Sequence, residues 1–197
     1  MGTIATIGHS THPIEHFVGL LRMNGVTAVA DVRSTPFSRR NPQFNREALQ
    51  ADLGRAGIAY VHLGRELGAR SPDPEHYEGG RISYERLAES ARFQEGIARV
   101  IDGAARHRIA LMCAERDPII CHRTILVSRA LVRRGVAVEH ILADGRIEPH
   151  ADAMDRLVRE LNLDPDDLFV TDDDLHERAY QAQGRRMAPA RPDSAAD

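Results

Sequence analysis

Short apolar runs alternate along most of this chain with longer segments in which apolar and polar residues are mixed. Five of these runs are six or seven residues long and rich in Ala, Val and Ile, which predicts buried strands. They span residues 3–8, 27–32, 58–63, 109–114 and 136–142. Runs without a polar face are typical of parallel sheets, which are covered on both sides.

The segments between these runs have the spacing and end signals of helices. In the first segment Pro13 suits the opening turn, and Ser10 or Thr11 is expected to cap it. The other predicted helices cover residues 46–55 (capped by Asn45), 83–105, 121–135 and 151–161. Strands that alternate with helices predict an α/β fold. We expect a mostly parallel sheet of five or slightly more strands with helices on both faces, a Rossmann-like three-layer sandwich.

The length of 197 residues fits one domain with a tail. We expect a single α/β domain over residues 1–171. Residues 172–197 become acidic and then rich in Ala, Pro and Arg, which predicts a flexible C-terminal tail. Residues 65–82 form a long excursion rich in Gly, Pro and charge, and whether they close over a site as a lid is left open.

Composition is that of an ordinary globular protein, with 42% hydrophobic and 28% charged residues. All 26 basic residues are Arg, and the net charge of −3 argues against non-specific DNA binding through a positive surface. The N-terminus lacks the pattern of a signal peptide, and no segment has the ~20 apolar residues of a membrane span. The two cysteines are expected to be free thiols or metal ligands, since a chain with a sizeable core does not need a disulfide. Together these features favour the cytoplasm and no membrane partner.

Polar residues follow four of the predicted strands at the points where they end. His9 and Ser10 come after the first strand, and Arg33 comes after the second. Glu66, a candidate acid or base, soon follows the third strand, and Glu115 follows the fourth. Ligands of parallel α/β sheets bind beyond the carboxyl ends of the strands. We therefore expect these side chains to gather at one edge of the sheet.

The run CAERDPIICHR at residues 113–123 holds the densest group of reactive side chains. Cys121, His122 and Arg123 lie at the expected start of a helix, where free N–H groups favour anions and shift a thiol toward thiolate. Cys121 can then act as a nucleophile, or it can be a small buried apolar residue. Glu115 is the first candidate for a general acid or base because it lies next to a buried strand end.

Several catalytic and ligand-binding motifs are absent from the sequence, and this reduces the number of candidate reactions. Neither cysteine has an Arg six residues later, as a phosphatase or rhodanese loop needs, and the chain has no G-x-G-x-x-G, Walker loop or H-E-x-x-H. The seven-residue gap between the cysteines is not a zinc-ribbon spacing, so a metal is not favoured and the cofactor is left unknown. If a metal is present, the candidate ligands are Cys113, Cys121 and His122, with His9, His62 or His140 as a fourth.

The loop after the second strand, residues 31–40, is rich in Arg and Ser. Guanidinium groups pair bidentately with phosphate and hydroxyl groups add donors, so this loop can bind an oxyanion. Phe37 and Phe44 can stack a base or anchor the loop. His9, with Ser10 as a hydroxyl partner, is a candidate general base or part of a helix cap. The candidate anion-binding residues of the loop are Asp31 (which would orient Arg33), Arg33, Ser34, Ser38 and Arg39.

Four blocks occur in order along the chain: IGHST, DVRSTPFSRRNPQFN, GIAYVHLGRELGAR, and LMCAERDPIICHR followed by VEHI. With them the chain resembles, over roughly residues 3–150, a bacterial family catalogued as domain of unknown function 488. Ala69 stands where the family often has a second Gly after LG, a departure that concerns local loop shape. The resemblance implies an α/β fold but no established reaction. The site residues it points to are His9, Ser10, Asp31, Arg33, Ser34, Pro36, Ser38, Arg39, Glu115, Cys121, His122 and Arg123.

The sequence favours an enzyme, a hydrolase or transferase, that acts on a phosphate-bearing substrate such as a nucleotide or a nucleic-acid end or base. Arginines of the rim would hold the anion, and Glu115 with His9 or His122 would perform acid–base chemistry beside Cys121. Two alternatives stay open: a non-catalytic module that binds a nucleotide or nucleic acid, and a metal-dependent hydrolase with Cys121 and His122 as ligands. The expected partner is therefore a small anionic substrate or a nucleic acid, and the sequence gives no oligomeric state.

Overall fold

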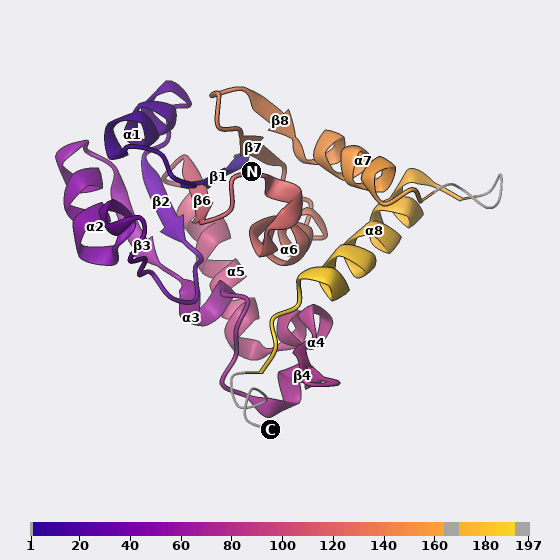
Figure 1. Cartoon of the computed structure of the whole chain (residues 1–197). Helices are drawn as coiled ribbons and strands as arrows, with labels where there is room; N and C mark the ends of the chain where they lie inside the picture. The colour runs from indigo at the N-terminus through magenta and orange to yellow at the C-terminus, as the bar shows by residue number, and fades with distance from the viewer. Residues whose placement is uncertain (1, 164–169, 192–197) are drawn as a thin grey trace.

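A six-stranded sheet forms the centre of the molecule, with the strand order β3-β2-β6-β1-β7-β8 (Figure 1). The structure, a computed structural model, describes residues 2–163 and 170–191. Five neighbouring strands are parallel, and β8 pairs with β7 in the antiparallel sense. The prediction of a mostly parallel sheet is confirmed. The strands are β1 (Ile4–Gly8), β2 (Ala28–Asp31), β3 (Ala59–His62), β6 (Ile109–Cys113), β7 (Val138–Ile141) and β8 (Ile147–Pro149).

Helices cover both faces of the sheet, which confirms the predicted three-layer arrangement (Figure 1). α1 (Ile14–Met23) and α2 (Arg46–Arg55) pack on one face, while α5 (Ala91–Ala104), α6 (Arg129–Val132) and α7 (His150–Glu160) pack on the other. In the described part of the chain, no helix has both the length and the apolar character that a membrane crossing requires. The remaining elements are α3 (Gly64–Leu67), α4 (Tyr84–Glu89), α8 (Asp172–Met187), the 3₁₀ helices η1 (Pro42–Phe44), η2 (Pro74–His76) and η3 (Pro118–Ile120), the π-helix η4 (Arg123–Ser128), and the hairpin strands β4 (Tyr77–Glu78) and β5 (Arg81–Ile82).

The pleat of each strand divides its side chains between two hydrophobic cores. In β6, Ala110 and Met112 face the core beneath α1 and α2, whereas Leu111 and Cys113 face the core beneath α5 and η4. Every residue of β1 and β6 is buried, which explains why these strands appear as uninterrupted apolar runs. β3 lies at the edge of the sheet, and its residues alternate between exposed and half-buried.

Local helical structure differs from the sequence prediction in three places. The segment 83–105 forms two helices, α4 and α5, because Ser90 leaves the helical conformation and its Oγ accepts a hydrogen bond from the Phe93 N–H. The segment 121–135 contains the fully buried π-helix η4 before α6. The prediction of Ser10 or Thr11 as the cap of α1 is wrong, since α1 begins after Pro13 without a side-chain cap.

The C-terminal segment forms the helix α8, where composition predicts a flexible tail. Thr171 and Asp174 form a capping box at its start, and its acidic first turn suits the positive end of the helix dipole. Tyr180, in the middle of the helix, is buried against the domain. The tail prediction is therefore wrong for this helix, because the caps and the buried face outweigh the polar composition. Residues 192–197 of the predicted tail lie outside the described residues.

The Gly- and Pro-rich segment 65–82 packs against the domain. Leu67 in α3 is fully buried next to α5, where Gly96 leaves room for it. The end of the β4–β5 hairpin is tied to the C-terminal segment, because the Ile82 N–H donates to the Pro189 carbonyl at 3.0 Å. The role of this segment as a lid stays a prediction.

Candidate functional site

The carboxyl ends of β1, β2 and β6 lie next to one another, because β6 inserts between β1 and β2 in the sheet. The chain leaves β1 toward α1 on one face and leaves β6 toward η4 on the other, and such a divergence opens a crevice at the sheet edge. Two groups of polar side chains gather there. The thiol cluster consists of Cys113, Glu115, Cys121 and His122, and the arginine cluster consists of His9, Asp31, Arg33 and Tyr60.

The thiol cluster brings both cysteines, a carboxylate and an imidazole together. Oε2 of Glu115 lies 3.0 Å from Sγ of Cys113 and 2.9 Å from Sγ of Cys121. Nδ1 of His122 lies 3.6 Å from Sγ of Cys113. One ligand atom from each of the four residues lies within 4.8 Å of all the others. The η3 turn produces this arrangement, because it returns the chain from the end of β6 to the same end of the sheet.

Only Glu115 among these four residues is exposed. Cys121 is 0% exposed, Cys113 is 3% and His122 is 8%. The Glu115 side chain is exposed as a whole, but its Oε2 atom contacts both sulfurs. Glu115 therefore links the buried thiols to solvent.

The charges of the thiol cluster depend strongly on one another. Burial raises the pKa of Glu115, as does the neighbouring Cys121, and burial also raises the pKa of Cys113 well above its ordinary value. Burial opposes ionisation of Cys121, but the hydrogen bond from Cys113 and the charge of Arg123 hold the pKa of Cys121 well below its ordinary value. Burial likewise opposes protonation of His122, yet contact with Cys121 raises the pKa of His122. These shifts favour a Cys121 thiolate beside a protonated His122.

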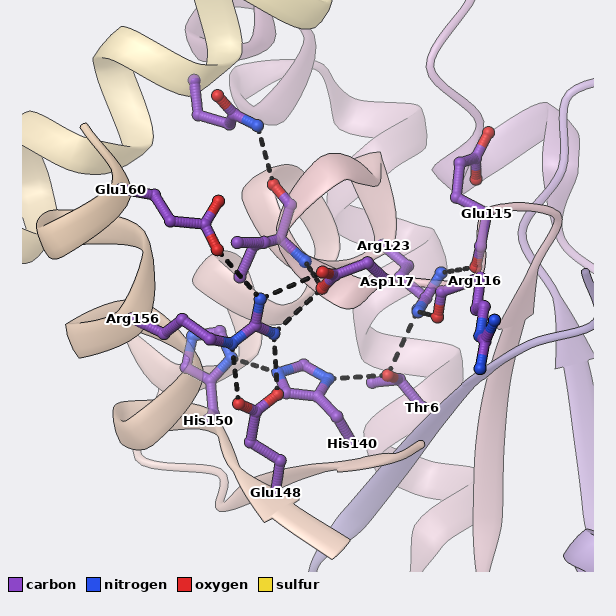
Figure 2. A network of polar contacts seen from close by, with 12 residues as sticks. Thr6, Glu115, Arg116, Asp117, Arg123, His140, Glu148, His150, Arg156 and Glu160 are labelled. Carbon is purple, nitrogen blue, oxygen red and sulfur yellow. Dashed lines mark hydrogen bonds and ion pairs between the residues drawn. The ribbon is translucent and has the colours of Figure 1, made fainter. Parts of the chain in front are cut away.

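Arg123 anchors the loop that carries Glu115 (Figure 2). Its Nη1 donates to the Glu115 carbonyl at 2.7 Å, its Nη2 to the Arg116 carbonyl at 3.3 Å, and its Nε to Oγ1 of Thr6 at 3.4 Å. Gly8 makes room for this loop, because a Cβ at that position would lie 1.8 Å from the Glu115 carbonyl oxygen. The side chain of Arg123 is 0% exposed, so the geometry does not favour its predicted contact with a substrate anion.

Arg33 forms a buried bidentate ion pair with Asp31. Its Nε donates to Oδ1 at 2.9 Å and its Nη2 to Oδ2 at 2.6 Å. Nη2 also donates to the Phe44 carbonyl at 2.8 Å, and the Tyr60 hydroxyl donates to Oδ2 of Asp31 at 2.9 Å. Nη1 donates to Nε2 of His9 at 3.1 Å. One N–H of Nη1 has no partner among the described residues, so Arg33 keeps a single donor for a ligand.

His9 accepts a hydrogen bond from Arg33 and helps to hold its guanidinium group in place. Because its Nε2 accepts from Arg33, its Nδ1 carries the proton and donates to the Ser10 carbonyl at 2.8 Å. Burial and the charge of Arg33 lower the pKa of His9 to about 4. The ring stacks on Phe44 with the centroids 4.2 Å apart. With both ring nitrogens used inside the protein, the geometry does not favour the predicted role of His9 as a general base.

A cavity of about 360 Å³ opens beside these clusters and is called the rim cavity below. Ala114, the residue before Glu115, lines its side near the thiol cluster, and the exposed ring of Phe37 lines it from the loop after β2. No carboxylate belongs to the lining. Cationic and hydroxyl groups without a competing acid suit an oxyanion. Its arginines and hydroxyl residues are Arg33, Arg40, Ser10, Thr11, Thr35 and Ser38.

The structure separates the predicted anion-binding residues. Ser10, Arg33 and Ser38 line the rim cavity, whereas Arg39 is exposed outside it. The hydroxyl of Ser34 accepts a hydrogen bond from a backbone N–H of the following excursion. Arg40 belongs to the predicted anion-binding loop and lines the cavity, but the sequence prediction names Arg39 in its place, because loop composition does not tell which of two adjacent arginines faces the cavity.

The histidines predicted as a fourth metal ligand lie outside the thiol cluster, in which Glu115 is the fourth residue. His62 Nε2 contacts the Arg33 carbonyl at 2.9 Å. His140 belongs to a buried chain of hydrogen bonds that connects α8 to Arg123, and Figure 2 shows its part from His150 to Arg123. In this chain the Tyr180 hydroxyl contacts Nε2 of His150, Nδ1 of His150 contacts Nε2 of His140 at 3.0 Å, and Nδ1 of His140 contacts Oγ1 of Thr6 at 2.7 Å. In the sequence, these hydrogen bonds are signalled only by a polar residue within each of two apolar runs, Thr6 in residues 3–8 and His140 in residues 136–142.

Arg156 on α7 holds the loop before η3 in place (Figure 2). Its guanidinium contacts Oδ1 of Asp117 at 2.9 Å, Oε1 of Glu148 at 3.0 Å and Oε1 of Glu160 at 3.4 Å. Asp117 also accepts a hydrogen bond from the Ile119 N–H and so starts η3. We call Arg156 with Asp117, Glu148 and Glu160 the Arg156 clamp. It fixes the turn that places Cys121 in the thiol cluster.

Comparison with known proteins places the chain in a family. The sequence model described as Domain of unknown function DUF488 matches residues 13–130. The matched segment includes the arginine-rich loop after β2 and the whole thiol cluster. Neither the curated proteins nor the solved structures that were compared include a match. Because the match covers more than half of the chain, this protein belongs to the DUF488 family, a domain of unknown function.

Proposed function

We propose that this protein is an enzyme, a hydrolase or transferase, that acts on a phosphate-bearing substrate such as a nucleotide or a nucleic-acid end. The observation that carries the proposal is the rim cavity, whose lining combines two arginines and four hydroxyl side chains with no carboxylate. Arg40 is exposed and has no ion-pair partner in the described part of the chain, so its charge is available to a substrate. The remaining N–H of Arg33 adds a fixed donor.

Phe37 supports a nucleotide rather than a simple phosphate ester. Its ring is 61% exposed although it lines the rim cavity. A base that stacks on this ring gains roughly 1–3 kcal/mol, and stacking of this kind tolerates any base. Phosphate on the arginines and a base on Phe37 would together use the two kinds of surface that the loop presents.

Glu115 is the group that we assign to acid–base work. It is the exposed carboxylate next to Ala114, at the side of the rim cavity that faces the thiol cluster. Its main-chain position is fixed by Arg123, which gives a catalytic carboxylate a defined place. The compartment that we propose is the cytoplasm, since the two cysteines are free and buried.

Calorimetric titration with AMP, CMP, GMP, UMP and inorganic pyrophosphate tests the proposal. Arg40→Ala should weaken binding about tenfold or more, because it removes a charged hydrogen bond to phosphate. Arg39→Ala is the matched control, since Arg39 is adjacent and exposed but does not line the cavity. Phe37→Ala should weaken nucleotide binding and leave pyrophosphate binding unchanged. Equal affinities of the two arginine variants, or no binding at all, would refute the anion site.

The catalytic part is tested separately with Glu115→Gln. This variant should bind the nucleotide that the wild type turns over, and it should lose turnover. Unchanged turnover would refute the role of Glu115. If the wild type binds nucleotides without converting any of them, the protein is a binding module and the enzymatic part of the proposal is overturned.

A further inference from the structure

The thiol cluster has the donor set of a transition-metal site. Two thiol groups, an imidazole and a carboxylate converge from a strand end and the turn that follows it. Thiolate and imidazole are the ligands that zinc prefers, with carboxylate as a common fourth. Hard oxygen-binding cations such as Mg²⁺ would not select two sulfurs.

The distances in the cluster match tetrahedral zinc after small side-chain shifts. Ligands that lie 2.0–2.3 Å from zinc are about 3.3–3.8 Å from one another in a tetrahedron. The Cys113 Sγ to His122 Nδ1 distance is 3.6 Å, and the Glu115 Oε2 atom is 3.0 and 2.9 Å from the two sulfurs. All four ligand atoms lie within 4.8 Å of one another, about 1 Å more than the longest edge of such a tetrahedron.

His122 is oriented in the way that metal-binding histidines are oriented. Its Nε2 lies 3.1 Å from the Val32 carbonyl oxygen, which can only accept, so this nitrogen carries a proton. Its Nδ1 faces the sulfur of Cys113. A histidine that binds a metal almost always donates its other N–H to a carbonyl or carboxylate. This contact comes from Val32, the residue after β2, and is therefore independent of how the cluster itself is built.

A metal also completes the charge balance of the buried region. Arg123 is fully buried, and no carboxylate forms an ion pair with it among residues 2–163 and 170–191. Two thiolates and the Glu115 carboxylate carry three negative charges, while one divalent ion and Arg123 carry three positive charges. A buried cation without a counter-charge is strongly destabilising, and the negatively charged ligands of the metal supply a counter-charge for Arg123.

We propose that the thiol cluster binds one Zn²⁺ ion through Cys113, Cys121 and His122, with Glu115 as the fourth and exchangeable ligand. Three buried ligands and one exposed ligand resemble catalytic zinc sites, in which water occupies the fourth position, more than closed structural sites. The metal site stands by itself. Its use in catalysis rests on the proposed function, and it makes hydrolysis the reaction class expected for a substrate in the rim cavity.

Elemental mass spectrometry of the untagged full chain, purified with a phosphine reductant and without chelator, tests the proposal. We expect about one zinc per chain. After removal of zinc, Co²⁺ should give the intense visible bands of tetrahedral cobalt and a thiolate charge-transfer band in the near ultraviolet. A reduced protein that takes up neither metal, or a cobalt spectrum without the thiolate band, would overturn the proposal.

Variants assign the ligands. Cys121→Ser and His122→Ala should lose stoichiometric metal, whereas Glu115→Gln should retain it with lower affinity and shifted cobalt bands. His107→Ala is the matched control, because His107 is exposed and lies outside the cluster, and it should keep full metal content. If the ligand variants fail to fold, X-ray absorption at the zinc edge of the wild type decides. Two sulfur ligands at about 2.3 Å support the site, and an all-nitrogen and oxygen shell refutes it.

Nucleotide titrations of zinc-free and zinc-loaded protein separate the two proposals. If the wild-type protein takes up no zinc but still binds nucleotides, the metal site is refuted and the anion site is left intact. Zinc binding without nucleotide binding would do the reverse.

Discussion

At the scale of single residues, a buried ion pair organises the edge of the sheet. Asp31 is 0% exposed and Arg33 is 6% exposed. Desolvating two charges is costly, and it is offset here by bidentate geometry and by further hydrogen bonds to Tyr60 and the Phe44 carbonyl. The pair therefore fixes the loop after β2, and its charge is largely neutralised within the protein.

Replacing Asp31 by Asn should destabilise the protein by about 3–5 kcal/mol, because it leaves the Arg33 charge buried without a partner. Urea denaturation measures the change. Asp52→Asn is the control, since it removes an ion pair with the exposed Arg55 at the surface, where such pairs contribute about 0–1 kcal/mol. Similar losses in the two variants would contradict the structural role of the buried pair.

At the scale of elements, α7, α8 and β7 meet at buried histidines. His150 begins α7, His140 lies in β7 and Tyr180 comes from α8, and each contacts the next through a ring nitrogen or hydroxyl. Burial and the neighbouring His176 lower the pKa of His150 to about 4. Burial and the neighbouring His150 also hold the pKa of His140 well below its ordinary value. Both imidazoles are thus neutral in the folded protein near neutral pH.

The free energy of unfolding should fall as the pH is lowered from about 6.5 to about 4. In this window the unfolded chain protonates His150, with an ordinary pKa of 6.5, while the folded protein does not. The contribution is fully present above pH 6.5, and the loss is at most about 3 kcal/mol for this residue. Denaturation at several pH values should show a smaller slope for His150→Gln than for the control His107→Gln, which alters an exposed histidine. Equal slopes in the two variants would contradict this account.

At the scale of the whole molecule, three strand ends, two helical layers and the Arg156 clamp converge on one edge of the sheet. The clamp joins α7 and β8 to the loop before η3, and Arg123 joins that loop to β1. The thiol cluster thus lies where elements from the N-terminal and C-terminal halves meet. A ligand bound there would hold the end of β6 and the start of η4 together.

If the zinc proposal holds, metal should stabilise the entire domain. A ligand at 1,000 times its dissociation constant raises the free energy of unfolding by about 4 kcal/mol when it binds only the folded state. Thermal unfolding should therefore shift upward on zinc addition and downward with a chelator. Cys121→Ser should lose this response, whereas His107→Ala should keep it. A chelator response in Cys121→Ser equal to that of the wild type would contradict the assignment of Cys121 as a ligand.

The sequence by itself determined the five parallel strands of the sheet, though not the short antiparallel β8, and the edge at which the site lies. A strand buried on both faces needs an uninterrupted apolar run, so β1 and β6 can be recognised from the local sequence. Polar residues at the strand ends mark the carboxyl edge of the sheet. The thiol cluster was also within reach, since Cys113, Glu115, Cys121 and His122 lie within ten residues of one another.

Only the tertiary structure decided what these residues do. The strand order places β6 between β1 and β2, and this makes neighbours of residues far apart in the chain. Arg33 and Arg123 look like anion-binding residues in the sequence, but protein groups take four of the five N–H groups of Arg33 and the side chain of Arg123 is fully buried. Arg40 remains open in the rim cavity. Composition likewise could not reveal α8, because its stability depends on burying Tyr180 against elements distant in sequence. Local patterns fix what is buried and suggest the pairing of Asp31 with Arg33. The contacts of Arg33 with His9 and of Arg123 with Thr6 join residues far apart in the sequence, so no local pattern encodes them.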